Sequence, residues 1–181
     1  MIHDPDLLDR LESLPKESFA GDVSRATRMN LNPLAGSYSG GRWMRRDAAA
    51  VVYTSVTREG ALAEIAFHLS QLNPRPTKPI VVHRLRVVAQ RTLRLIRADL
   101  ATLGVPESVY KNVNLPRKQE IGAAVEFLGC DGLIAPSARW SCDNLMLFSD
   151  RLGADATLEI VSSETVDWIA WATENGLLGD G

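Results

Sequence analysis

Residues 40–64, GGRWMRRDAAAVVYTSVTREGALAE, lead the chain from a glycine turn through an apolar strand into an amphipathic helix. Arg42, Tyr53 and Glu64 follow one another at equal intervals along this stretch. The apolar and partly β-branched residues around Tyr53 predict a buried strand. Thr57 then precedes apolar residues at helical spacing, which predicts a helix that carries Glu64. We expect the three polar side chains to face one cleft.

The rest of the chain alternates between short strands and helices. Gly129 follows an apolar helical stretch and suits a left-handed helix C-cap. Arginines interrupt the apolar residues of 79–96, as in a strand with one solvated face. We expect helices over 4–15, from Thr57 to before Pro74, over 118–128 and over 164–176; strands over 23–27, 49–55, 132–135, 144–149 and 157–161, with one or two more over 79–96; a loop over 29–41; and irregular structure with a short helix over 98–114.

The motifs of nucleotide-binding parallel sheets do not occur in the sequence. No GxGxxG follows the first strand, and no GxxxxGK[ST] is present. The short strands favour an α+β fold with a mixed, mostly antiparallel core and flanking helices. A chain of 181 residues has room for one well-buried domain. We expect a single domain over 1–181, with an N-terminal helix within 1–20 and a C-terminal helix within 164–177.

The composition is that of an ordinary globular protein, with 45% hydrophobic and 23% charged residues. No apolar run approaches the ~20 residues of a membrane span. The acidic N-terminus lacks the basic and apolar parts of a signal peptide, so we expect a cytoplasmic protein with no membrane partner. Cys130 and Cys142 lack CxxC spacing, and Glu64 and His68 have no third ligand at a suitable distance in sequence. The sequence predicts reduced structural thiols and no metal site.

The charged residues are distributed unevenly. The net charge of −2 argues against a general nucleic-acid binder. Yet the charged residues from Arg75 to Arg97 are all basic, whereas acids predominate from Asp150 onward. The basic stretch is either a solvated strand face or the surface of a non-enzymatic module that binds nucleic acid or protein. The binding module is kept as an alternative hypothesis.

Two groups of short motifs occur together, one in each half of the chain. Their combination resembles the RES domain, a family named for its arginine, glutamate and serine, and the resemblance is strongest over 23–149. The motifs are Arg25-Ala26, Asn32-Pro33-Leu34, Gly40 to Trp43, Val51 to Tyr53 and Ala61 to Glu64, followed by Ile121-Gly122, Asp131 to Ile134, Pro136 to Arg139 and Asn144 to Phe148.

The resemblance implies a fold similar to that of ADP-ribosyltransferase toxins. It also implies the toxin of a type II toxin–antitoxin pair, which uses NAD+ as co-substrate and needs no metal. The expected reaction cleaves nicotinamide from ribose and passes ADP-ribose to a protein, to phosphate or to water. The expected partner is an Xre-like antitoxin that covers the active site, and no direct nucleic-acid contact is expected.

The resemblance implies Glu64, Arg25 and Tyr53 as catalytic residues and Ser137 as a contact of NAD+. By resemblance, Glu64 is the catalytic carboxylate, which would stabilise an oxocarbenium-like cation through preorganised electrostatics. Tyr53 can stack on nicotinamide and offer its hydroxyl to the ribose. Ser137 can hydrogen-bond the carboxamide or a ribose hydroxyl.

Arginines and a glycine complete the expected NAD+ site. Arg25, expected beside Glu64, and Arg42 can hold phosphate through bidentate hydrogen bonds that lysine does not match. Arg28 competes with Arg25 for the position of the family's first arginine, and both remain candidates. Gly41 permits close approach of the backbone to a ligand. The adjacent Trp43 is interpreted as a core anchor of this turn.

Overall fold

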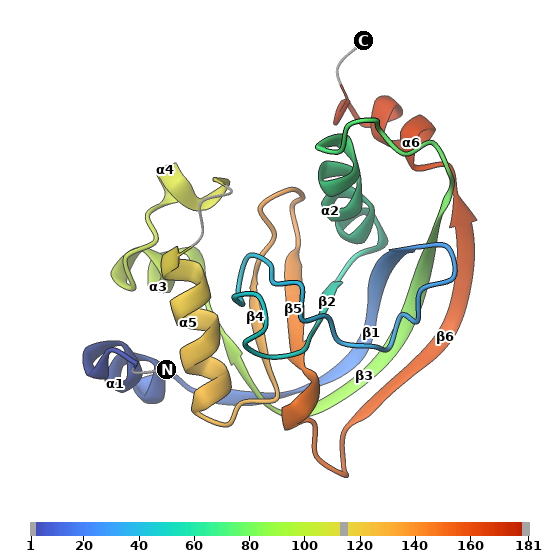
Figure 1. The fold of residues 1–181 in the computed structure, drawn as a ribbon. Coiled ribbons are helices and arrows are strands. Elements are labelled where there is room, and N and C mark those ends of the chain that lie inside the picture. Colours follow the sequence, from blue (N-terminus) through green and yellow to red (C-terminus); the bar gives the residue numbers. More distant parts are fainter. Residues whose placement is uncertain (1–2, 113–115, 179–181) are drawn as a thin grey trace.

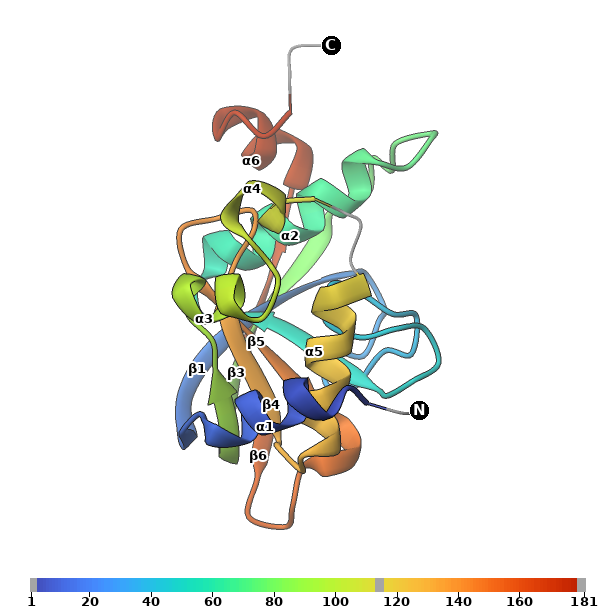
Figure 2. The same ribbon diagram turned by 90° about the vertical axis from the view of Figure 1, so that its left-hand side faces the viewer.

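A computed structural model describes residues 3–112 and 116–178 of the chain. Helices α2 and α6 lie together at one end of the long curved strands, and helices α1, α3 and α5 lie at the other end (Figures 1 and 2). The elements are α1 (Pro5–Ser13), β1 (Lys16–Arg28), β2 (Val51–Ser55), α2 (Arg58–Ser70), β3 (Ile80–Arg94), α3 (Arg97–Thr102), α4 (Glu107–Tyr110), α5 (Pro116–Phe127), β4 (Gly132–Pro136), β5 (Asp143–Phe148), the 3-10 helix η1 (Ser149–Arg151), β6 (Thr157–Val166) and α6 (Trp168–Glu174).

The strands of the described residues form one sheet in the order β1-β2-β5-β4-β3-β6. Only β3 and β4 pair in parallel, whereas the other pairs are antiparallel. β1 pairs with β2 and also with β3 along most of its length. The sheet therefore curls back on itself. This architecture confirms the predicted α+β class with a mostly antiparallel core.

Local sequence signals account for several element boundaries. Thr57 caps α2, because its Oγ1 accepts a hydrogen bond of 3.1 Å from the Gly60 N–H. The helix buries Leu62 and Leu69 in a core cluster shared with β3 and α6. After α5, Gly129 has a φ of 74°, which confirms the predicted left-handed cap.

The ends of the chain differ from the sequence-based boundaries. The helix predicted over 4–15 is present as α1, but β1 begins at Lys16 and not at residue 23, because residues 16–22 pair with β3. Residues 164–166, predicted to begin a helix, extend β6 instead, with Val166 opposite Ile80. Long-range pairing with β3 therefore lengthens both strands beyond what local periodicity indicated.

The structure shows how many strands and helices the middle of the chain contains. The stretch 79–96 contains one continuous strand, β3, whose pairing with β6 has an irregularity between Arg84 and Leu85. The segment 98–114 contains two short helices, α3 and α4, instead of one. Residues 113 and 114 of that segment lie outside the described residues. Neither described range contains a helix long and apolar enough to cross a membrane.

Trp43 anchors the turn that enters β2. Its side chain is 1% exposed and packs in the cluster formed with α1, α3 and α5. Gly122 of α5 lies so close that an added Cβ would stand 1.7 Å from the Trp43 carbonyl oxygen. The turn carrying Gly41 and Arg42 is thus held against α5, which fixes its position beside the sheet.

Candidate active site

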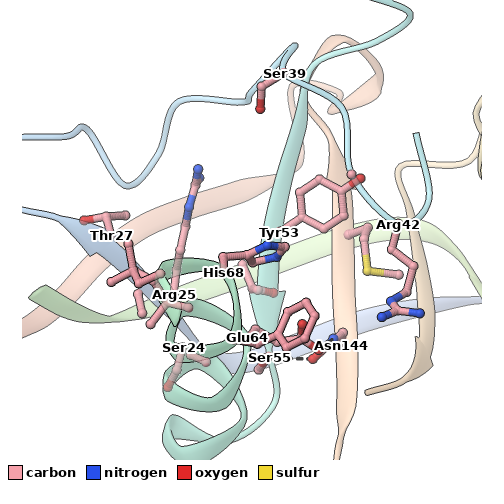
Figure 3. Close-up of a pocket in the computed structure, with 18 of the residues that line it drawn as sticks. Ser24, Arg25, Thr27, Ser39, Arg42, Tyr53, Ser55, Glu64, His68 and Asn144 are labelled. Carbon is pink, nitrogen blue, oxygen red and sulfur yellow. Dashed lines mark hydrogen bonds between the residues drawn. The ribbon is translucent and has the colours of Figure 1, made fainter. Parts of the chain in front are cut away.

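A cavity of about 510 Å³ lies among β1, the 39–43 turn, β2, α2 and β5. Its size falls in the range of roughly 300–1,000 Å³ usual for small-molecule sites. Figure 3 shows Arg25 and Arg42 on opposite sides, with Tyr53 and Glu64 between them. The structure gathers six of the predicted site residues in the cavity wall: Arg25, Arg28, Gly41, Arg42, Tyr53 and Glu64.

Glu64 of α2 is half-buried and held through one carboxylate oxygen. Its Oε1 accepts hydrogen bonds of 2.8 Å from Ser137 Oγ and of 2.8 Å from Asn144 Nδ2. Ser137 Oγ in turn accepts the backbone N–H groups of Arg139 and Trp140 at 3.1 and 3.2 Å. Among the described residues no basic side chain forms an ion pair with Glu64. Neutral hydrogen-bond donors therefore hold the Glu64 carboxylate in its orientation.

The β1 side of the cavity carries both candidate arginines. Arg25 is half-buried, and its Nη1 donates to the carbonyl oxygens of Pro33 and Ala35 at 2.8 and 3.0 Å. Burial lowers the pKa of the Arg25 guanidinium. Arg28 lines the same cavity from the exposed end of β1. The geometry thus places Arg25 deeper than Arg28 and ties it to the loop that follows.

Tyr53 and Gly41 lie against each other in the cavity wall. A Cβ on Gly41 would stand 2.7 Å from the Tyr53 hydroxyl, so this position needs a glycine for close approach. The preceding Gly40 has a φ of 78°. Burial raises the pKa of Tyr53 to about 12, and within the described part of the chain its hydroxyl has no hydrogen-bond partner. Tyr53 therefore lines the cavity with its ring, while its protonated hydroxyl is buried against the turn that carries Gly41.

Arg42 lines the cavity and lies close to other basic side chains, Arg97 and Lys118. Its Nη1 donates to the Tyr110 carbonyl at 2.7 Å. Arg42, Arg97 and Lys118 stand 5.7, 3.9 and 5.3 Å from the centre of the Tyr110 ring. Burial, with repulsion from Arg42, Arg139 and Arg97, lowers the pKa of Lys118 to about 8. This side of the cleft therefore carries more positive charge than nearby groups neutralise.

Ser137 meets Glu64, and its predicted contact with NAD+ stays a prediction. Its side chain is 3% exposed, and it contacts Glu64 without lining the cavity. Asn144 and Ser55 do line the cavity beside Glu64 and were missed as site residues. Asn144 lies within a quoted motif, yet its contact with Glu64 depends on strand pairing that the sequence does not display.

His68 and Arg139 are further neighbours of the site. His68 lines the cavity, where burial lowers its pKa, with smaller contributions from the charges of Arg139 and Arg42 and an opposing one from Glu64. Arg139 stacks on Phe67 with its guanidinium carbon 3.4 Å from the ring centre. In the described residues no group of three or more His, Cys, Asp and Glu could hold a metal.

Fold and cavity together define a class of protein, an α+β domain whose cleft holds a carboxylate between two arginines. A family model for the RES domain matches residues 18–169, and the chain belongs to the RES family. A chain from the crystal structure of the M. tuberculosis MbcT-MbcA toxin-antitoxin complex has a TM-score of 0.79 and 15% identity, covering 94% of this chain and 97% of that chain. At that identity the likeness shows a shared fold. No curated protein has a significant sequence match.

Proposed function

We propose that this protein is the toxin of a toxin–antitoxin pair and that it cleaves the bond between nicotinamide and ribose in NAD+. Family membership and a fold shared with a chain of a toxin–antitoxin complex support this proposal. The observation that carries it is Glu64, a carboxylate with two neutral donors on one oxygen, in a cavity with Arg25 and Arg42 on its two sides.

The reaction requires the protein to favour a positively charged ribose. When the C–N bond breaks, its electron pair stays with the nicotinamide nitrogen, and positive charge develops on the ribose. The anionic Glu64 stabilises that charge, since its hydrogen bonds hold it in place before the reaction begins. The cation is then captured by an acceptor, for which protein, phosphate and water are all candidates.

The remaining cavity residues serve to bind NAD+ in this proposal. Arg25 and Arg42 have no carboxylate partner among the described residues and are suited to hold the diphosphate. Tyr53 presents its neutral ring for stacking on the nicotinamide, while its hydroxyl is buried against the 39–43 turn. Ser137 acts through Glu64, so its family role is assigned here to orientation of the carboxylate.

The partner in this proposal is an Xre-like antitoxin that covers the cleft in the cytoplasm. Such a partner suppresses activity by blocking NAD+ entry, so the purified free toxin is active and the complex is not. The cavity wall itself includes partly exposed apolar and basic residues, among them Leu31 and Arg28, which a partner can contact.

The decisive experiment measures nicotinamide release from NAD+ by the purified protein, free of antitoxin. The assay is run with and without phosphate and with cell extract, and mass spectrometry follows the ADP-ribose. Label on protein indicates mono-ADP-ribosylation, whereas ADP-ribose-1-phosphate or free ADP-ribose indicates phosphate or water as acceptor.

Glu64→Gln is the variant that tests the carboxylate. We expect it to lower turnover by roughly 10²-fold or more, as for loss of a preorganised electrostatic group. Glu59→Gln is the matched control, because Glu59 lies on the same helix, is outside the cavity wall and makes only an exposed contact of 3.6 Å with Arg58. A folded Glu64→Gln protein with unchanged turnover would sink the catalytic assignment.

A further inference from the structure

Glu64 has two carboxylate oxygens in unequal surroundings. Oε1 accepts both Ser137 Oγ and Asn144 Nδ2, whereas no side chain or backbone donor of the described residues contacts Oε2. The two donors come from different places, since Ser137 follows β4 and Asn144 lies on β5. Two donors converging on one oxygen restrict rotation of the carboxylate more than either one alone.

Both the backbone and the side chain of Asn144 are held by neighbouring strands. Its backbone lies between two neighbouring strands, opposite Ser55 of β2 and Ala135 of β4. Its side-chain Oδ1 accepts a hydrogen bond of 2.7 Å from Ser55 Oγ. Ser55 is 2% exposed, so water does not readily compete for this contact.

The Glu64 carboxylate, which only accepts hydrogen bonds, determines which end of the Asn144 amide faces it, and the Ser55 hydroxyl donates to the other end. The reversed amide would place Oδ1 beside the carboxylate oxygen, where two acceptors repel each other. With Nδ2 pointing to Glu64, Oδ1 accepts from the Ser55 hydroxyl. The chain Ser55–Asn144–Glu64 therefore has a defined donor direction from β2 through β5 to α2.

We propose that Asn144, supported by Ser55, is a positioning residue that holds Glu64 Oε1 and leaves Oε2 directed at the ligand. The catalytic part of this inference rests on the proposed function of Glu64. The contact itself does not, because it is a property of the folded protein. Two separate readouts follow, one of stability and one of turnover.

The stability readout uses a donor–acceptor exchange. Asn144→Asp removes the donor and places a second carboxylate beside Glu64, so at pH 8 we expect the Tm to fall by about 5 °C. Adding Glu64→Gln creates an amide that can donate to the new carboxylate, and most of that loss should return. Asn32→Asp is the matched control and should barely change the Tm, because the exposed Asn32 side chain only accepts a hydrogen bond, from the Leu34 N–H, and aspartate can accept it as well.

The turnover readout compares kcat with KM for NAD+. We expect Asn144→Asp to lower kcat by roughly 10²-fold and Ser55→Ala by roughly 10-fold, with KM within about 3-fold of the wild type, because the carboxylate is misdirected while binding contacts remain. Ser149→Ala controls for the Ser55 change, since the Ser149 hydroxyl is buried without a partner and lies outside the cavity.

The outcomes distinguish the proposed cleavage of NAD+ from the positioning role of Asn144. A wild type that never releases nicotinamide overturns the proposed function, whereas the Tm exchange still decides whether Asn144 holds Glu64. Recovery of Tm in the double variant supports the contact, and additive losses overturn it. If Asn144→Asp is folded and turns over NAD+ at the wild-type rate, Asn144 is not a positioning residue.

Discussion

Two groups of basic residues in this protein have different hydrogen-bond partners. The outer arginines, defined as Arg84, Arg86 and Arg94 of β3, lie on its solvated face and pair with carboxylates. Arg84 and Arg86 contact Asp22 at 3.8 and 3.3 Å, and Arg94 contacts Glu17 at 2.9 Å. The inner cations, defined as Arg25, Arg42, Lys118 and Arg139, instead donate to backbone carbonyls.

The fold neutralises the charge of the outer arginines with carboxylates, whereas the charge of the inner cations remains available to a ligand. A carbonyl dipole satisfies a hydrogen bond but cancels no net charge, whereas a carboxylate does both. Salt and water also weaken the exposed outer pairs. The inner cations therefore present the potential that attracts an anion. In the basic stretch noticed in the sequence, by contrast, Arg84, Arg86, Arg94 and Arg97 pair with carboxylates.

Arg25→Lys should show the largest effect on this comparison. Lysine keeps the charge but loses the planar fork, and Arg25 is half-buried beside the loop it anchors. We expect KM for NAD+ to rise by roughly 10²-fold, near the upper range for losing charged hydrogen bonds. Arg84→Lys, the same change on the outer face, is the control and should leave KM unchanged. Equal KM values for the two variants would contradict the distinction between inner and outer arginines.

Arg42→Lys should have a smaller effect of the same kind. Lysine again keeps the charge and loses the planar fork, and here the nearby Arg139 and Lys118 can supply some of the missing hydrogen bonds to phosphate. We expect roughly a 10-fold rise in KM, equivalent to about 1.4 kcal/mol. Steady-state kinetics at fixed ionic strength measure it. No change would show that NAD+ does not reach the Tyr110 side of the cavity.

Local sequence patterns predicted the elements that carry the site. The cap at Thr57, the apolar residues around Tyr53 and the left-handed Gly129 are properties of short segments, and the structure has all three features. Most motif residues also converge on one cavity, although their roles in the reaction stay predictions.

Contacts that depend on strand register could not be read from the chain. Asn144 meets Ser55 because β5 pairs with β2, and Ser137 reaches Glu64 because β4 ends beside α2. Likewise, β6 extends to Val166 because β3 offers a partner along its edge, which overrode the local helical pattern. Periodicity describes a segment's own faces, whereas these features depend on which segments become neighbours.

The lowered pKa of Lys118 reports both its burial and the repulsion among the inner cations, and it can be tested without any ligand. Lys118 is 3% exposed, and its pKa falls from 10.5 to about 8 on folding. Because the folded pKa is below the unfolded one, the unfolded state holds more protons between these values, and stability rises with pH there. From pH 8 to 9 the free energy of unfolding should gain about 1 kcal/mol relative to Lys118→Met. Denaturant titrations of both proteins test this, and parallel pH curves would contradict it.

Arg86→Ala should have the smallest effect. Its side chain is 54% exposed and shares Asp22 with Arg84, so the free energy of unfolding should change by no more than about 0.5 kcal/mol. Turnover of NAD+ should stay at the wild-type level. The alternative of a nucleic-acid-binding module predicts instead that the Arg84→Ala/Arg86→Ala protein loses a steeply salt-dependent affinity for DNA or RNA. Such a loss, measured by fluorescence anisotropy at two salt concentrations, would mean that the paired outer arginines are functional after all, since their carboxylates would have to be displaced by phosphate.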